Sequence, residues 1–189
     1  IEGIQNNGII NHYEYIINSE GTIEIRHVLK PEGKMPLWFP RIGLTLTVSD
    51  ALDQVKWYGR GPQENYPDRK TGYPTGIYAS TVQAMYEPYL MPQDYGLRTD
   101  VRWLQLTTDK GIGLQFKMNE WFNFNIYPYS TDNLTKAMYT YQLQKQKGMT
   151  LNLDYATTGV GCTARGVFGA YKAMPQEYRR TISIRPMMK

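Results

Sequence analysis

The segment with the densest set of hydrogen-bonding side chains lies between residues 57 and 69 and reads Trp-Tyr-Gly-Arg-Gly-Pro-Gln-Glu-Asn-Tyr-Pro-Asp-Arg. Its glycines and prolines favour an irregular backbone, because glycine adopts conformations closed to other residues and proline fixes one backbone angle. The polar side chains that follow the second glycine are Gln63, Glu64, Asn65, Asp68 and Arg69. Carboxylates accept hydrogen bonds from sugar hydroxyls, amide and guanidinium groups donate to them, and tyrosine or tryptophan covers the apolar face of a sugar ring. The segment therefore indicates a carbohydrate-binding loop.

The same charged side chains are also consistent with a purely structural role. Glu64 or Asp68, paired with a nearby arginine such as Arg60, would hold the loop in place without any ligand. For Glu64 the sequence favours neither interpretation. For the adjacent pair of Asp68 and Arg69 the structural interpretation is the favoured one.

Other reactive residue types are sparse. The two histidines, His12 and His27, lie on predicted early strands, away from Glu64 in the sequence. We therefore do not expect a histidine to act as an acid or base beside Glu64, and the histidine spacing indicates no metal site. The single cysteine, Cys162, excludes an internal disulfide and a cysteine-based zinc site, and we interpret it as a small buried or half-exposed thiol.

The composition excludes several classes of partner. Among 189 residues, 21 basic side chains face 17 acidic ones, so the net charge of +4 belongs to a mixed surface and does not predict nucleic-acid binding. No apolar run approaches the ~20 residues of a membrane helix, and the start at Ile1 has the character of an internal site in a longer chain. The compartment stays open. The 16 tyrosines and 4 tryptophans suit both half-buried strands and sugar rings.

Alternation of apolar and polar residues predicts an all-β fold of about ten short strands, because successive side chains of a strand point to opposite faces. The predicted hairpins pair residues 9–18 with 22–29, 43–49 with 54–59, and 101–106 with 112–117. Further strands are predicted at residues 122–127, 151–155 and 181–185. One helix is expected over residues 130–139, with Ser130 as its cap and with Leu134, Ala137 and Met138 on one face.

Two long connections, residues 59–74 and 85–98, are the first places to look for function. They exceed the length of hairpin loops and are rich in proline, tyrosine and polar groups. The tryptophans lie mostly on or beside predicted strands, where core packing is favoured over sugar stacking. They are Trp38, Trp57, Trp103 and Trp121.

Residues 59 to 69 resemble the Gly-x-Gly-Pro-x-Glu-Asn-Tyr-Pro-Asp-Arg signature of the C-terminal, small-chain domain of family-two β-galactosidases. Further stretches that follow in the family's order are residues 40–43, residues 85–89 with Pro92 and residues 96–98, Asn125 with residues 129–130, residues 151–154 and residues 159–161. The resemblance implies an antiparallel β-supersandwich of the galactose-mutarotase type. It also implies that residues 1–189 form a single β-sandwich domain, the C-terminal fragment of a longer multidomain chain, lacking its first strands.

In this family the two catalytic glutamates belong to a separate barrel domain, which nothing in this chain resembles. The resemblance therefore implies a non-catalytic domain that packs on the barrel of a β-galactosidase and shapes the sugar site, and we expect the chain alone to be inactive. The alternative is an autonomous carbohydrate-binding module that uses the concave sheet face. No cofactor is expected in this domain, with any Mg²⁺ or Na⁺ of the parent enzyme held elsewhere. The expected partners are the other domains of that enzyme, a galactoside or other sugar and, in an oligomer, a second copy; nucleic acid and membrane are not expected.

The resemblance also extends the set of candidate sugar contacts. Arg98 resembles an arginine that the family holds on the concave face, where it would bind sugar hydroxyls or pair with Glu64. Some family members contribute a tryptophan from the loop that here spans residues 162–166, and this sequence has none there, although Arg165 offers a polar contact instead. The predicted carbohydrate-binding residues are Glu64, Asn65, Asp68, Arg69, Arg98 and Arg165.

Overall fold

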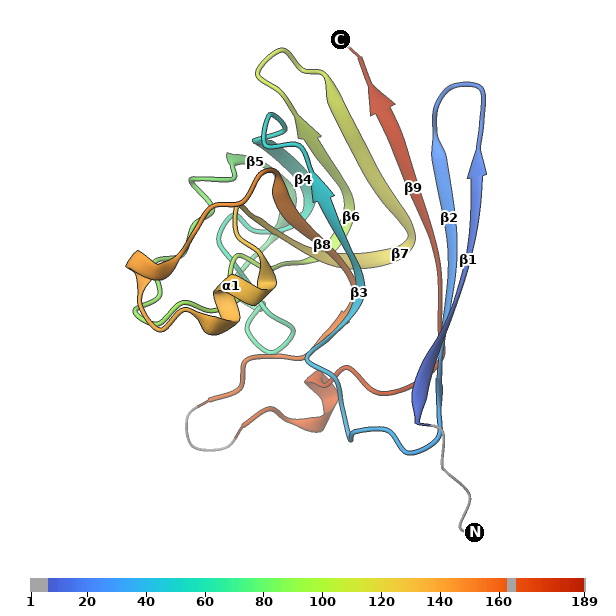
Figure 1. The fold of residues 1–189 in the computed structure, drawn as a ribbon, viewed down its shortest axis with the longest axis vertical. Helices are drawn as coiled ribbons and strands as arrows, with labels where there is room; N and C mark the ends of the chain where they lie inside the picture. Colours follow the sequence, from blue (N-terminus) through green and yellow to red (C-terminus); the bar gives the residue numbers. More distant parts are fainter. Residues whose placement is uncertain (1–6, 163–165, 189) are drawn as a thin grey trace.

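The computed structural model describes residues 7–162 and 166–188. In this part of the chain nine strands form one antiparallel sheet. The strands are β1 (Gly8–Ile17), β2 (Ile23–Glu32), β3 (Arg41–Val48), β4 (Gln54–Arg60), β5 (Thr75–Thr81), β6 (Arg98–Thr107), β7 (Gly113–Tyr127), β8 (Met149–Thr157) and β9 (Tyr178–Met187). The helical elements are α1 (Thr131–Lys136) and the single 3-10 turns η1 (Thr140–Gln142) and η2 (Gly169–Tyr171). The predicted all-β, antiparallel class is confirmed (Figure 1).

The long strand β7 organises the sheet. One of its edges pairs with β6, which continues to β4 and β5. Its other edge pairs first with β9 and then, toward its end, with β8. Because β9 leads to β2 and β1 while β8 leads to β3, the sheet divides at β7 into two arms, which diverge in Figure 1.

Apolar side chains from both arms form one buried cluster. It includes Ile25 of β2, Ile42 of β3, Trp57 of β4, Phe116 of β7, Leu153 of β8 and Ile182 of β9. Burial follows the period of two that the sequence predicts, most clearly in β4. The expected core packing of Trp57 is confirmed by its 0% exposure, whereas Trp121 is 60% exposed, so core packing was the wrong prediction for that residue.

Two of the three predicted hairpins are confirmed. The strands β1 and β2 pair along their whole length and join at a turn closed by Gly21, whose φ of 76° lies in the left-handed region. The strands β6 and β7 also form a hairpin, with Gly111 at φ 79° in their turn, although their register shifts between Arg98 and Trp103. Glycine at both turns explains why these local pairings could be predicted.

The second predicted hairpin is wrong, although both of its strands exist. Strand β3 pairs with β8, while β4 pairs with β5 and β6. Strand β8 is buried over most of its length and lies between β3 and β7, so β3 covers its otherwise free edge. Strand β5 was not predicted, and the segment expected as a separate strand at residues 122–127 is the second half of β7.

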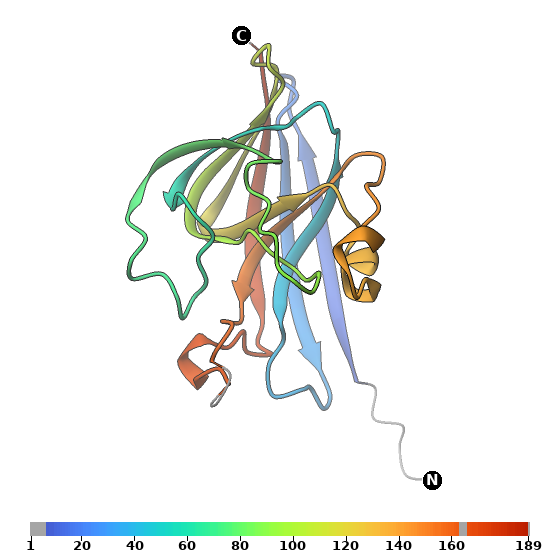
Figure 2. The same ribbon diagram turned by 90° about the vertical axis from the view of Figure 1, so that its left-hand side faces the viewer.

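The helix α1 is shorter than expected but begins as predicted. The Ser130 hydroxyl accepts a 3.0 Å hydrogen bond from the Asn133 N–H, which caps the first turn. Leu134 and Ala137 are buried, but Met138 is 55% exposed because the backbone turns extended at Ala137, so Met138 does not share their face. Figure 2 shows the connection after β4 and helix α1 on opposite sides of the sheet. None of the described helices is long and apolar enough to cross a membrane.

Candidate functional site

The loop that follows β4 is tied to β6 through Asn65. The Asn65 N–H donates to the Leu97 carbonyl oxygen at 2.8 Å, and its Oδ1 accepts from the N–H and the hydroxyl of Thr99 at 3.1 and 2.6 Å. Its Nδ2 donates to the Gln63 carbonyl oxygen at 3.0 Å. Asn65 is completely buried, so in this structure its amide positions the loop.

Glu64 accepts hydrogen bonds at both carboxylate oxygens. Its Oε2 accepts from the Gly96 N–H at 2.8 Å and from the Tyr66 hydroxyl at 3.1 Å, and the Tyr89 hydroxyl donates to Oε1. Burial, together with the Glu64 charge, raises the pKa of Tyr89 to about 12 and raises the pKa of Tyr66 further. Glu64 forms no ion pair with Arg60, whose Nε contacts Asp100 at 2.5 Å instead. The half-buried carboxylate is therefore held by neutral donors.

Arg98 lies beside this carboxylate but does not pair with it. The side chain is 3% exposed, its Nη1 donates to the Gly96 carbonyl oxygen at 2.9 Å, and its guanidinium carbon lies 5.5 Å from the centre of the Trp57 ring. Its Nε has no hydrogen-bond partner among the described residues. Burial lowers the pKa of Arg98 to about 10, against the opposing influence of Glu87 and Glu64.

Glu87 is a member of this cluster to which the sequence analysis assigned no role. Burial and the nearby Glu64 charge raise its pKa, and Arg98 opposes that shift. The cluster therefore holds one buried cation near enough to two carboxylates for their charges to affect its pKa. Glu87 lies within the second long connection and within residues 85–89, a stretch that carries the family resemblance, so both features pointed toward this residue.

Asp68 fixes the loop from the other side. Its two oxygens accept from the Val160 N–H at 3.0 Å and from the Gly161 N–H at 2.7 Å. A Cβ at Gly159 would lie 2.3 Å from the Asp68 carboxyl carbon, so the close approach requires glycine. Asp68 thus binds backbone rather than Arg69, which is exposed and which, among the described residues, hydrogen-bonds only through its backbone to Tyr66.

Of the six predicted contact residues, the structure brings Glu64, Asn65 and Arg98 together, and Asp68 and Arg69 lie farther along the same loop. Arg165 lies outside the described residues. Cys162 is exposed, so the expectation of a buried or half-exposed thiol was wrong. His27 is buried, with its ring nitrogens 2.7 Å from the Tyr155 hydroxyl and 3.0 Å from Asn11 Oδ1, and it packs in the sheet as predicted.

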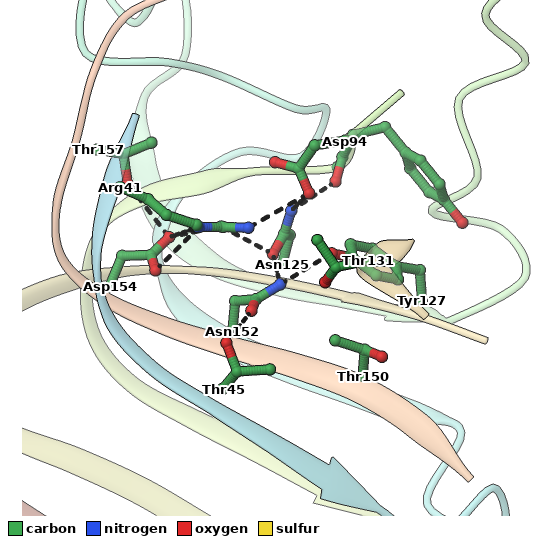
Figure 3. A network of polar contacts seen from close by, with 12 residues as sticks. Arg41, Thr45, Asp94, Asn125, Tyr127, Thr131, Thr150, Asn152, Asp154 and Thr157 are labelled. Atoms are coloured by element: carbon green, nitrogen blue, oxygen red, sulfur yellow. Dashed lines mark hydrogen bonds and ion pairs between the residues drawn. The ribbon is translucent and has the colours of Figure 1, made fainter. Parts of the chain in front are cut away.

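A second polar network lies where β3, β7 and β8 meet the connection before β6 (Figure 3). The Arg41 guanidinium contacts the buried Asp154 carboxylate at 2.6 Å and Asp94 at 3.3 Å. Asn125 accepts from Arg41 Nη2 at 3.1 Å and donates to Asp94 Oδ1 at 2.9 Å, and Asn152 donates to the Asn125 Oδ1 at 2.9 Å. Burial disfavours the charged form of Arg41, but the two carboxylates outweigh it and raise the pKa.

This network was missed as a functional unit, although the sequence carries a signal for it. In β8, Asn152 and Asp154 alternate with leucines on a strand that is buried on both faces. Polar side chains at such positions need partners, since an unpaired buried polar group is costly. The partners come from three other segments, and the Asp94 side chain at one end of the network is well exposed, at 47%.

In both sites the polar side chains hydrogen-bond or pair with other side chains and backbone groups of the protein. Among residues 7–162 and 166–188, no three histidine, cysteine or acidic side chains gather in a way that could hold a metal ion. Glu64 and Glu87 are close enough to influence one another, but both Glu64 oxygens are already bonded.

Comparison with known proteins places these features in a family. Residues 4–184 match the family described as "Beta galactosidase small chain". The β-galactosidase of Priestia megaterium is 38% identical over 147 residues, which cover 78% of this chain and 14% of that protein. That of Pseudoalteromonas haloplanktis is 33% identical over 159 residues, covering 82% of this chain and 14% of that protein. The chain thus spans about a seventh of the length of these relatives. With nearly its whole length matched, the chain belongs to the β-galactosidase small chain family.

Proposed function

We propose that this chain is the C-terminal domain of a β-galactosidase and that it is not catalytic itself. In the parent enzyme, which would hydrolyse terminal β-D-galactosides, it packs on the barrel domain and shapes one wall of the galactoside site. The family match and the β-galactosidase relatives support the parentage. The two-armed antiparallel sheet is compatible with a supersandwich of the galactose-mutarotase type.

The hydrogen bonding of Glu64 carries the non-catalytic part of the proposal. Glycoside hydrolysis by two carboxylates requires one group to give up a proton and the other to attack or activate water across the scissile bond. Glu64 instead accepts hydrogen bonds from two tyrosine hydroxyls and a backbone N–H, so both of its carboxylate oxygens are bonded within the protein. The cluster is thereby suited to hold a wall in a fixed shape.

The wall would act through positions that the loop presents outward. Gln63 and Arg69 are exposed on either side of the Glu64 and Asn65 anchors. Because the anchors are rigid, an exposed guanidinium or amide there would meet a sugar or a neighbouring domain in a defined position.

Variants of the parent polypeptide test this role. Glu64→Gln removes the charge that the two tyrosines and Gly96 support, and it should raise the KM for an aryl β-galactoside or lower kcat by a moderate factor. Glu32→Gln, on the exposed surface of β2, is the matched control and should leave both constants unchanged. Equal constants for Glu64→Gln and the control would exclude a role for the loop in shaping the site.

An autonomous carbohydrate-binding module is the second candidate, and the unpartnered Nε of buried Arg98 favours it. A sugar hydroxyl that reached the guanidinium would complete its hydrogen bonding. Calorimetric titration of the chain with galactose or lactose decides between the candidates. Heat that disappears in Arg98→Met supports the module, and no heat from either sugar supports a wholly structural cluster.

A further inference from the structure

A pocket of about 600 Å³ opens on a part of the molecule that neither polar site uses. It is bounded by the turn between β3 and β4, the connection between β5 and β6, and the two ends of the β7 to β8 connection. Its size lies within the range of about 300–1,000 Å³ that is typical of small-molecule sites. The lining residues used below are Asp53, Gln83, Tyr86, Tyr95, Tyr129 and Lys145.

Three tyrosine rings form the apolar part of the wall. Tyr86 and Tyr95 meet edge to face at 5.3 Å and 89°, and Tyr129 packs against the same small cluster. Tyr86 and Tyr129 are half-buried, so each ring keeps one part exposed. Rings of this kind provide the flat apolar surface on which the C–H face of a pyranose packs.

Polar side chains surround these rings. Asp50, Asp53, Gln83 and Lys145 are exposed at the rim. Within the described residues, Lys145 forms no ion pair and Gln83 makes no side-chain hydrogen bond, so both remain available to a ligand. Two carboxylates beside one ammonium group disfavour phosphorylated ligands, because they repel a dianion. The mixture of acceptors and donors favours a neutral ligand rich in hydroxyl groups.

The walls are held in place by bonds between segments. The Val82 N–H donates to the Asp53 carbonyl oxygen at 3.0 Å, and the Gln146 N–H donates to the Pro128 carbonyl oxygen at 2.9 Å. The Thr150 hydroxyl donates to the Tyr129 carbonyl oxygen at 2.7 Å. A pocket fixed in this way loses little conformational freedom when a ligand enters.

The Tyr95 hydroxyl is the independent sign of a ligand. Tyr95 is 2% exposed, and its hydroxyl has no hydrogen-bond partner among the described residues. Nearly all buried polar groups in proteins are paired, so an unpaired hydroxyl on a residue that lines the pocket needs an explanation. A sugar hydroxyl would supply the partner through a bridging water, or directly once a small shift of the lining side chains uncovers the Tyr95 hydroxyl.

We propose that this pocket binds a neutral sugar of one or two pyranose rings, at a site separate from the Glu64 cluster. The site would serve attachment to a saccharide and would require no chemical step. Its existence does not depend on the role of the Glu64 loop.

Tyr95→Phe is the sharpest test, because it removes only the unpaired hydroxyl. Binding of galactose, lactose and cellobiose is measured by calorimetry and by saturation-transfer NMR. The variant should keep or increase its Tm, since no hydrogen bond to protein is lost, and should weaken binding of the preferred sugar about fivefold, the factor that one neutral hydrogen bond provides. Tyr129→Ala should weaken binding at least as much, and Gln83→Ala serves the same purpose should Tyr129→Ala not fold.

Two controls locate the site. Tyr141→Ala and Tyr15→Ala each remove an exposed tyrosine outside the pocket, and both should leave affinity unchanged. The absence of binding by all three sugars in the millimolar range overturns the proposal. So does binding that Tyr95→Phe and Tyr129→Ala leave intact, or that Glu64→Gln abolishes; the last result would assign the sugar to the Glu64 cluster.

Discussion

Asp68 and Gly161 lie 93 positions apart in the sequence, yet the Asp68 carboxylate accepts a 2.7 Å hydrogen bond from the Gly161 N–H. The neighbouring Val160 N–H binds the other oxygen, so one carboxylate joins the Glu64 loop to the turn after β8. This junction places the loop relative to the sheet, and it depends on glycine at position 159.

Gly159→Ala tests the closeness of that junction. The added methyl group would collide with the Asp68 carboxylate, so the free energy of unfolding should fall by about 1–3 kcal/mol. Gly169→Ala is the matched control, since no atom lies within 4 Å of a Cβ at that position, and its effect should stay within about 0.5 kcal/mol. Urea denaturation measures both variants. Equal stability of the two variants would show that the Asp68 carboxylate does not lie close to Gly159.

Asp154→Asn tests the network around Arg41. The Asp154 side chain is 3% exposed, and its removal as a charge leaves the Arg41 guanidinium without its closest partner. Breaking a buried ion pair from one side costs about 3–5 kcal/mol, so a loss near the lower figure is expected because Arg41 is partly exposed and keeps Asp94. Lys136→Ala breaks the exposed pair with Asp132 and should cost less than about 0.5 kcal/mol. A small effect of Asp154→Asn would show that the network does not stabilise the fold.

His27 should make stability depend on pH below neutrality. Burial lowers its pKa from the ordinary 6.5, so the folded chain binds a proton less readily than the unfolded chain does. The contribution of His27 to the free energy of unfolding is therefore fully present above pH 6.5. It is lost as the pH falls from that value toward the lower pKa of the folded chain, with a slope of at most about 1.4 kcal/mol per pH unit. Melting curves from neutral pH to about pH 5 measure the slope. His27→Gln should reduce it, and an unchanged slope in that variant contradicts the assignment.

Tyr89 should report the charge of Glu64 directly. Burial and the Glu64 carboxylate together raise the Tyr89 pKa to about 12, so Glu64→Gln should move it back toward the ordinary value of 10.0. NMR titration of ring-labelled tyrosine follows the shift. Glu120→Gln, which alters an exposed carboxylate paired with Arg180, is the control. A Tyr89 pKa that stays the same in Glu64→Gln would show that the Tyr89 hydroxyl does not donate to the Glu64 carboxylate.

The parts of the fold that could be predicted are those determined by neighbours in the chain. The β1 and β2 hairpin follows from alternation and a glycine turn, and the cap of α1 follows from Ser130. The partner of β3 could not be predicted, because its alternating pattern fits any strand with an apolar face. Its actual partner, β8, lies about a hundred positions away. Because β8 is buried along most of its length, its free edge needs a partner strand, and β3 provides it.

The contacts of the Glu64 cluster divide in the same way, into those between neighbours in the sequence and those between distant residues. Tyr66 lies two positions from Glu64, whereas Tyr89 and Gly96 lie 25 and 32 positions away, so most of the cluster depends on tertiary folding. The exposure of Trp121 was missed for a related reason. Its ring lies on the outer side of β7, where the Arg102 guanidinium covers it at 4.0 Å. The period of two predicts alternation along a strand but not which face the core will occupy.

The most direct test of the proposed role is the hydrolysis of an aryl β-galactoside by the purified chain, compared with its Glu64→Gln and Glu87→Gln variants. If the chain is a non-catalytic domain, all three proteins should release the aryl group no faster than buffer alone. Hydrolysis by the unmodified chain that either variant reduces would contradict this account, because it would make the Glu64 cluster a catalytic centre.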